Sequence, residues 1–323
     1  MRLQQISGCV SREFEEFDRL YSRSVSFDKG TLGQALRYVL SQHGKRIRPL
    51  LIILMAKACG QVTDSTYRSA VILELLHTAS LVHDDVLDKS DTRHNRPTVS
   101  RKWGNNTAVL LGDYLYGLCL QIIETREDFE LMSIYSRIAR ELPMGEILQK
   151  DISERQDVSL DSYYEVIRYK TASLFGAACY IGAKTSRAKD DYVSVAEDFG
   201  RNLGMAFQIR DDILDFDTRG DSGKGFGNDI YEKKITLPLI FHLETLSSVE
   251  RKRLFSFIRQ DEKENDKVLA FVNEVLLSGA LEKAEQLVEY YSDKAKMALL
   301  SLPESEYRNS LGDLVDCLVA RRV

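Results

Sequence analysis

The length, composition and charge of this 323-residue chain exclude several classes of protein. Its net charge of −5 gives no excess of positive charge for binding nucleic acid, so we expect no nucleic-acid partner. The five cysteines form no CxxC pair, which argues against a zinc site and indicates a reducing compartment. Because the chain has neither a secretory signal nor the roughly 18 consecutive apolar residues of a transmembrane helix, we expect a cytoplasmic protein with at most peripheral membrane contact.

Apolar residues recur at helical spacing along most of the chain. Clear examples are LGQALRYVL at 32–40, RSAVILELLHTASLVHDDVLD at 68–88 and YVSVAEDFGRNLGMAFQIRDDILDF at 192–216. No hairpin turn stands between alternating strands, and no Gly-, Ser- or Pro-rich linker interrupts the pattern. The sequence therefore predicts an all-α protein in which residues 1–323 form one single-domain helical bundle.

A basic cluster precedes the apolar run LLIILMAKA at 50–58. The sequence GKRIRP carries Lys45, Arg46 and Arg48 directly before Pro49. The compact ammonium group of a lysine beside the planar guanidinium group of an arginine suits the binding of a diphosphate. A solvated turn is the alternative, since short basic clusters are commonly found in such turns.

The helix predicted at 71–87 is apolar nearly all round, which is typical of a central helix, yet it ends in aspartates. A later helix ends in the same way, and both carry the pattern DDxLD: Asp84, Asp85, Asp88 and Asp211, Asp212, Asp215. Carboxylates four residues apart share a helix face and repel, so inward-facing triplets need cations. Magnesium fits, because it shares its coordination between carboxylates and substrate phosphates. Solvated helix ends or N-caps are the alternative, and the repetition of the pattern weighs against them.

Further basic and polar residues follow both triplets. They are Arg93, Arg96, Lys170, Thr171, Lys224 and Lys234. Each lysine by itself fits a surface position as well as a binding site. His77 lies seven residues before Asp84, about two turns back on the same helical face, and either a core or a binding role fits it.

Taken in order, these motifs resemble those of the trans-isoprenyl diphosphate synthases, the polyprenyl synthetase family. The motifs are GKRIRP, LLHTASLVHDDVLD, YKTASLF, FQIRDDILD and GKGFGNDIYEKKITLPL, between about residues 40 and 240. The resemblance implies an all-α terpenoid-synthase (isoprenoid synthase) fold with a central cavity, and a homodimer. It also implies a prenyltransferase that condenses isopentenyl diphosphate with an allylic diphosphate such as farnesyl diphosphate.

The resemblance also implies roles for individual residues. The two triplets would hold magnesium ions, three by this resemblance: Asp84, Asp85, Asp88, Asp211, Asp212 and Asp215. The residues implied as catalytic are Asp84, Asp85, Asp88, Lys170, Asp211 and Asp212. The allylic diphosphate would contact Arg93, Lys170, Thr171, Gln208, Lys224 and Lys234. Isopentenyl diphosphate would contact Lys45, Arg48 and His77.

Two positions depart from the family pattern. The family usually has paired arginines after the first triplet, where this chain has Arg93 followed by His94. Either His94 or Arg96 could supply the missing substrate contact, and the sequence leaves both open. Lys233 stands where a glycine commonly precedes the matching lysine, which leaves the register of Lys234 open.

Product length is expected to depend on the helix before the first triplet. Ala79 and Ser80 lie about 6 to 7.5 Å before Asp84 along the helix axis, and both are small. Short-chain members of the family carry a bulky aromatic residue near this point. Its absence predicts a long product such as octaprenyl diphosphate, with a quinone side chain as the expected use. Close helix packing would also explain small residues, and Tyr114 or Tyr116 could block the pocket instead.

Three other functions compete with a long-chain synthase. A shorter-chain synthase, making geranylgeranyl or farnesyl diphosphate, would need a blocking side chain elsewhere. A terpene cyclase shares the fold but usually has a different second metal motif and no GKxxR cluster. A non-catalytic partner subunit of a heteromeric synthase would not require both aspartate triplets.

Overall fold

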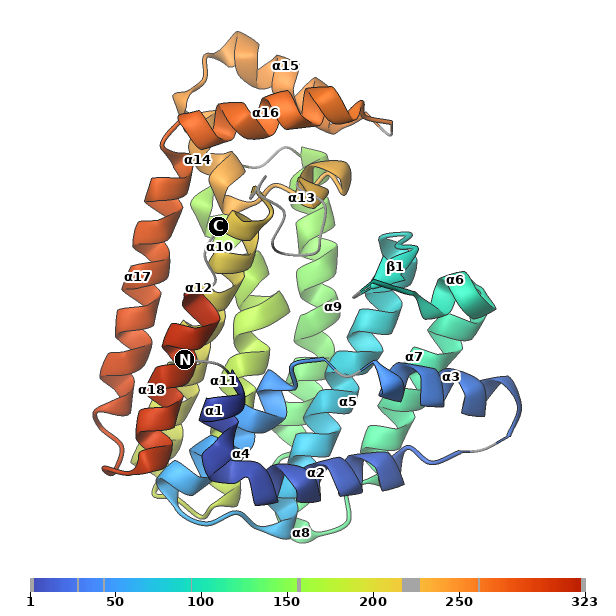
Figure 1. The fold of residues 1–323 in the computed structure, drawn as a ribbon, viewed down its shortest axis with the longest axis vertical. Helices are drawn as coiled ribbons and strands as arrows, with labels where there is room; N and C mark the ends of the chain where they lie inside the picture. The colour runs from blue at the N-terminus through green and yellow to red at the C-terminus, as the bar shows by residue number, and fades with distance from the viewer. Residues whose placement is uncertain are drawn as a thin grey trace. The chain divides into compact units, whose positions relative to one another are not determined.

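The computed structural model describes residues 3–27, 29–42, 44–93, 95–155, 158–216, 227–260 and 262–320. Its first helices are α1 (Leu3–Ser7), η1 (Gly8–Val10), α2 (Ser11–Ser24), α3 (Gly30–Ser41), α4 (Ile47–Cys59), α5 (Asp64–Leu87), α6 (Val99–Trp103), α7 (Asn105–Gln121) and α8 (Arg126–Glu130). The later ones are α9 (Met132–Arg155), α10 (Leu160–Ile167), η2 (Arg168–Ala172), α11 (Ser173–Thr185), α12 (Asp190–Leu214), α13 (Asn228–Tyr231), α14 (Leu237–Thr245), α15 (Ser248–Ile258), α16 (Asn265–Leu277), α17 (Ala280–Leu299) and α18 (Glu306–Val319). The predicted all-α class is confirmed (Figure 1).

Strand structure in the described residues is limited to one short antiparallel pair. Strands β1 (Thr92–Arg93) and β2 (Arg96–Pro97) place Thr92 opposite Pro97 and Arg93 opposite Arg96. This hairpin directly follows the first aspartate triplet. It therefore positions Arg93, one of the residues predicted to bind substrate.

The chain divides into two compact units. The first comprises Met1–Arg140, Phe175–Gly200 and Ala298–Leu314. The second comprises Glu141–Leu174, Arg201–Met297 and Val315–Val323. The single domain over residues 1–323 stays a prediction.

In the first unit the long helix α5 buries half of its residues, and it packs against α7, α4 and α2 (Figure 1). It begins with a capping box, because the Oγ1 atoms of Thr63 and Thr66 each accept a hydrogen bond from the other residue's backbone N–H. Gly112 lets α7 approach closely, since a Cβ there would lie 2.1 Å from Nε2 of His83. The helix predicted at 71–87 is the greater part of α5.

In the second unit the core joins the C-terminal part of α12 to α14, α16 and α17. Apolar side chains from these helices are fully buried, including Ile213, Ile240, Val272 and Val288. His242 of α14 lies in this core beside Phe271, with ring centroids 5.8 Å apart. Both ring nitrogens of His242 are buried without a hydrogen-bond partner, so its neutral form is the one that suits the core.

None of the described helices is both long enough and apolar enough to cross a membrane. The cysteines are unpaired thiols. Cys119 and Cys179 are buried, whereas Cys9, Cys59 and Cys317 are only half-buried.

Candidate active site

The first aspartate triplet occupies the C-terminal end of α5. Asp84 and Asp85 lie in the last turn, and Asp88 is the C-cap, with its N–H donating to Asp84 O at 2.8 Å. The C-terminus of a helix carries the negative end of the helix dipole, so each carboxylate there is disfavoured by about 0.3–1 kcal/mol. Three carboxylates at this position therefore favour a cation in the functional state.

Within this triplet Asp85 already has a cationic partner. It is 4% exposed, and its Oδ1 accepts a hydrogen bond from Arg93 Nε at 2.8 Å. Burial raises the pKa of Asp85, and the charge and hydrogen bond of Arg93 oppose that rise. The positive charge of Arg93 therefore offsets part of the negative charge of the triplet in this structure. Asp84 and Asp88 are half-buried on the same end of the helix.

His94 and Arg96 are the two candidates for the substrate contact that a second arginine makes in the family. His94, the residue that follows Arg93, lies outside the described residues. Arg96 donates to the backbone O of Ser41 at 3.3 Å, so in this structure its guanidinium contacts the end of α3.

The two arginines of GKRIRP have different environments. Arg46 adopts a left-handed backbone (φ 46°), pairs with Asp18, and lies over the rings of Phe17 and Tyr21 at 5.6 and 5.3 Å. It therefore fixes the start of α4. Lys45, by contrast, is exposed to solvent.

Arg48, in the first turn of α4, is the arginine with unused hydrogen-bonding capacity. Its guanidinium lies 5.4 Å from the ring centroid of Phe175, and its Nε is buried without a hydrogen-bond partner. Burial lowers the pKa of Arg48 to about 10, and Glu74 opposes the shift, so the side chain stays charged at neutral pH. A charged group with a buried, unsatisfied N–H is suited to bind an anion.

Glu74 is a charged site residue that the sequence interpretation missed. It lies on α5 one turn before His77, and burial raises its pKa while Arg48 and Arg46 oppose the rise. The signal was present in the sequence, because Glu74 is the one charged residue between 71 and 83 of the apolar helix apart from the histidines. Glu74, His77 and Asp84 share a half-buried face of α5.

The residues predicted to set product length lie on α5. Ala79 is fully buried, and Ser80 is half-buried and donates to His77 O at 2.8 Å. Tyr116 lies beside the His83 ring at 6.0 Å, and its pKa is raised by burial and by Asp84. Tyr116 is therefore close to the aspartate end of α5.

The other tyrosine considered as a block, Tyr114, packs against Phe27, with ring centroids 6.4 Å apart. The helices α5 and α7 run antiparallel, because Val109 O contacts His83 Nε2 at 3.0 Å and Cys119 donates to Ile72 O. The α7 side chains buried between these contacts are Leu111, Leu115 and Leu118. The buried α7 side chains between these two contacts are therefore aliphatic.

The second aspartate triplet ends α12 in the second unit. Asp212 is 4% exposed, and both its oxygens accept hydrogen bonds: Oδ2 from Tyr163 Oη at 2.7 Å and Oδ1 from Gln208 Nε2 at 2.9 Å. Burial raises the pKa of Asp212 to about 7, against these hydrogen bonds. Asp215 accepts from the N–H groups of Asn228 and Asp229 at 3.0 and 2.9 Å.

Asp211 differs from the other two aspartates of its triplet. It is half-buried, and within the described part of the chain its carboxylate has no hydrogen bond or ion pair. Asp212 and Asp215 are each held by two donors. Asp211 is therefore the carboxylate of this triplet that is most available to a cation.

Lys170 and Thr171 lie in η2, a single π-helical turn between α10 and α11. Lys170 Nζ contacts Glu146 Oε1 at 2.6 Å and Gln149 Oε1 at 3.0 Å, both on α9. Thr171 Oγ1 donates to Gln208 Oε1 at 2.6 Å. Such π-turns are frequent at functional sites. Glu146 and Gln149 were missed, since their proximity to Lys170 depends on tertiary packing.

Lys234 also lies near the second triplet. Its Nζ pairs with Glu232 at 2.5 Å. Burial and the carboxylates of Asp215 and Asp212 raise the pKa of Asp229, and the positive charge of Lys234 opposes that rise. Lys233 has φ 60°, a left-handed conformation that glycine adopts without steric cost. This backbone fits the position at which the family commonly has glycine, and it supports the register of Lys234. Lys224 lies outside the described residues.

The donor set of the triplets suits magnesium. Within either unit, no three acidic, histidine or cysteine side chains among the described residues form a group that could hold a metal by themselves. Magnesium usually uses one or two carboxylates and completes its shell with water and substrate phosphates. The open carboxylate of Asp211 and the half-buried pair Asp84 and Asp88 fit that requirement.

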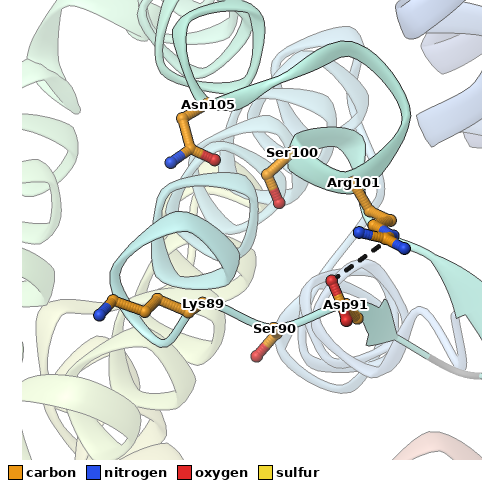
Figure 2. A pocket seen from close by; sticks show the side chains of 6 residues that line it. All are labelled: Lys89, Ser90, Asp91, Ser100, Arg101 and Asn105. Carbon is orange, nitrogen blue, oxygen red and sulfur yellow. Dashed lines mark ion pairs between the residues drawn. The ribbon is translucent and has the colours of Figure 1, made fainter.

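A polar hollow of about 240 Å³ follows the first triplet (Figure 2). Its lining residues are Lys89, Ser90, Asp91, Ser100, Arg101 and Asn105. Arg101 and Asp91 form a 3.7 Å ion pair across it, and both side chains are mostly exposed. None of the residues predicted to act on substrate lines it, so this hollow is separate from the candidate chemistry.

Known proteins resemble this chain over nearly its whole length. The polyprenyl synthetase family model matches residues 29–275. An all-trans-nonaprenyl-diphosphate synthase (geranyl-diphosphate specific) from Rhodobacter capsulatus is 34% identical and aligns over 96% of this chain and 95% of its own length. Component 2 of heptaprenyl diphosphate synthase from Geobacillus stearothermophilus is 35% identical over 97% of each chain. The crystal structure of a decaprenyl diphosphate synthase from Rhodobacter capsulatus superposes with a TM-score of 0.93, at 30% identity over 99% of each chain.

These similarities agree with the helical fold and with the order of motifs along the chain. The family model covers most of the sequence, and the identities exceed the level at which a family can be assigned. The chain therefore belongs to the polyprenyl synthetase family, all-helical prenyltransferases that depend on magnesium and act on isoprenyl diphosphates.

Proposed function

We propose that this protein lengthens an allylic diphosphate, such as farnesyl diphosphate, with isopentenyl diphosphate to a long all-trans polyprenyl diphosphate. The observation that carries the proposal is the pair of DDxLD triplets, each at the C-terminal end of a buried helix. The relatives are named as a nonaprenyl diphosphate synthase, a component of a heptaprenyl diphosphate synthase and a decaprenyl diphosphate synthase, which supports a product in that range. A quinone side chain is the proposed use of the product.

The metal ions would be held by carboxylates from both triplets. In the first triplet Asp84 and Asp88 would provide the contacting carboxylates, and in the second triplet Asp211 would do so; three ions are expected. Asp85, Asp212 and Asp215 would support them, because each already accepts hydrogen bonds within the protein. When bound, magnesium would neutralise the diphosphate as it leaves the allylic carbon.

The protein side chains would hold the two substrates by their diphosphate groups. The allylic diphosphate would contact Arg93, Lys170, Thr171, Gln208, Lys224 and Lys234. Isopentenyl diphosphate would contact Lys45, Arg48 and His77. As the allylic carbon–oxygen bond breaks, the double bond of isopentenyl diphosphate forms the new carbon–carbon bond. The released diphosphate would then take the proton that the condensed product loses.

Substitution of Asp84 tests the catalytic assignment. Asp84→Ala removes a metal-facing carboxylate and should reduce incorporation of labelled isopentenyl diphosphate by several orders of magnitude. The matched control is Asp91→Ala, an exposed aspartate three residues beyond the triplet, which should behave as the wild type. Near-normal turnover by Asp84→Ala would remove the first triplet from the reaction.

A second candidate function is that of the catalytic component of a two-component synthase. The observation in its favour is the 35% identity to a relative named as component 2 of its enzyme. The purified chain alone decides between the two. Activity without another protein would support the homomeric enzyme, and activity only after addition of a second component would support the heteromer.

The proposal includes a homodimer formed through α7. Its outward face carries exposed apolar side chains, with Val109 41%, Leu110 67% and Leu120 63% exposed. A second copy of the chain would cover this stripe. Leu110→Asp should shift the protein to a monomer in light scattering, and an unchanged mass would exclude this face.

We also propose that residues 1–323 act as one catalytic domain and that the product leaves through peripheral contact with a membrane.

A further inference from the structure

Asp212 is held by a continuous chain of hydrogen bonds inside the second unit. Thr171 Oγ1 donates to Gln208 Oε1 at 2.6 Å, and Gln208 Nε2 donates to Asp212 Oδ1 at 2.9 Å. From the other side, Tyr163 Oη donates to Asp212 Oδ2 at 2.7 Å. The chain therefore links the π-turn, α12 and α10 through one carboxylate.

The geometry of this chain fixes the orientation of each group. Because Thr171 donates to Oε1, the amide of Gln208 must turn its NH₂ toward Asp212. Each oxygen of Asp212 then has one side-chain donor, so the carboxylate cannot rotate without losing a hydrogen bond. Tyr163 is 4% exposed and lies in the apolar core of the unit, which leaves its hydroxyl little freedom to move.

The position of Asp212 matters because its neighbour in the sequence is the open carboxylate Asp211. Both belong to the last turn of α12, where a helix end is free to fray. Anchoring the Asp212 side chain to Tyr163 holds that turn in one conformation. Asp211 is then presented from a fixed backbone.

We propose that Tyr163 is a positioning residue for the second aspartate triplet: its hydroxyl fixes Asp212 and thereby the direction in which Asp211 presents its carboxylate to magnesium. The inference rests on the proposed role of this triplet in metal binding. Tyr163 does not itself contact substrate or metal. It acts through Asp212, whose Oδ2 it contacts, while Gln208 contacts the other oxygen, Oδ1.

The test is Tyr163→Phe, which removes the hydroxyl and keeps the ring. Hydrogen bonds to charged groups contribute about 1.5–3 kcal/mol, so kcat should fall roughly 10- to 100-fold at tenfold per 1.36 kcal/mol. The magnesium concentration for half-maximal activity should rise. The KM for isopentenyl diphosphate should stay unchanged, since its predicted contacts Lys45, Arg48 and His77 belong to the first unit.

The matched control is the adjacent Tyr164→Phe. Tyr164 is a half-buried tyrosine whose ring contacts Tyr163 and Tyr291 at 5.7 and 6.4 Å, and its hydroxyl has no hydrogen bond to any described residue. This variant should keep wild-type kcat and metal dependence. If the two variants behave alike, Tyr163 has no positioning role.

Two further measurements separate this inference from folding defects and from failure of the proposed function. Thermal unfolding with and without magnesium plus inorganic diphosphate should show a smaller ligand-induced shift for Tyr163→Phe than for Tyr164→Phe, and an equal shift would overturn the inference. Asp211→Ala, measured in the same series, tests the metal assignment itself. If Asp211→Ala is active while Tyr163→Phe is impaired, the triplet does not bind metal and the positioning role is also refuted.

Discussion

Replacing Gly145 with alanine should impair the enzyme without unfolding it. Gly145 is buried on α9 where that helix meets the π-turn, and a Cβ there would lie 3.0 Å from Lys170 N and 3.2 Å from Lys170 Cα. Ordinary van der Waals contacts at such positions begin at 3.4 Å. The π-turn that carries Lys170 must therefore shift by about 0.4 Å.

The expected effects on stability and activity differ. Alanine gains about 0.5–1 kcal/mol over glycine inside a helix, and this offsets part of the roughly 1–3 kcal/mol that overpacking costs. The protein should thus remain folded. A misplacement of 1 Å can cost about 100-fold in rate, so a shift of about 0.4 Å should lower kcat/KM for the allylic diphosphate about fivefold.

The assay is steady-state kinetics with the allylic diphosphate varied at saturating isopentenyl diphosphate. The control is Gly312→Ala on α18, where the new Cβ would meet only Leu299 Cδ1 at 4.0 Å. This control should keep wild-type kinetics. Wild-type kinetics for Gly145→Ala as well would show that the position of the π-turn does not limit the reaction.

Three further predictions concern product length and stability. Ala79→Phe should shorten the longest product, and an unchanged product distribution would remove Ala79 from the path of the growing chain. His242→Leu should make the unfolding free energy less dependent on pH between 7 and 5.5. Burial lowers the pKa of His242 in the folded state, so the unfolded chain binds more protons. The stability of the wild type therefore falls as the pH drops below about 6.5. An equally steep pH dependence in the variant would contradict this. Asp128→Ala should cost about 3–5 kcal/mol in urea unfolding, because it leaves Arg68 without the carboxylate it contacts at 2.8 Å; a loss under 1 kcal/mol would show that the pair is not a stabilising contact.

Much of the fold and of the candidate site was predictable, because the signals are local. The helical spacing of apolar residues predicts the helices, and DDxLD predicts carboxylates at the ends of α5 and α12. The resemblance named Thr171, Gln208 and Asp212, which the structure places in one hydrogen-bonded chain. Their roles in substrate and metal binding stay predictions.

The partners of these residues were not predictable, because they depend on contacts between distant segments. Tyr163 lies 49 residues from Asp212 in sequence, and Gln149 lies 21 residues from Lys170. No local pattern pairs them, since their proximity arises only when α9, α10 and α12 pack together. Glu74 is the exception, because a lone acidic residue in an apolar helix is visible in the sequence.

The most direct test of the central claim is a product analysis with the purified chain alone. The chain is incubated with magnesium, farnesyl diphosphate and labelled isopentenyl diphosphate, and the products are separated by length. We predict magnesium-dependent incorporation and a ladder that ends between heptaprenyl and decaprenyl diphosphate. A ladder that stops at geranylgeranyl diphosphate would contradict the long-chain assignment, and no incorporation at all would contradict catalysis by this chain alone.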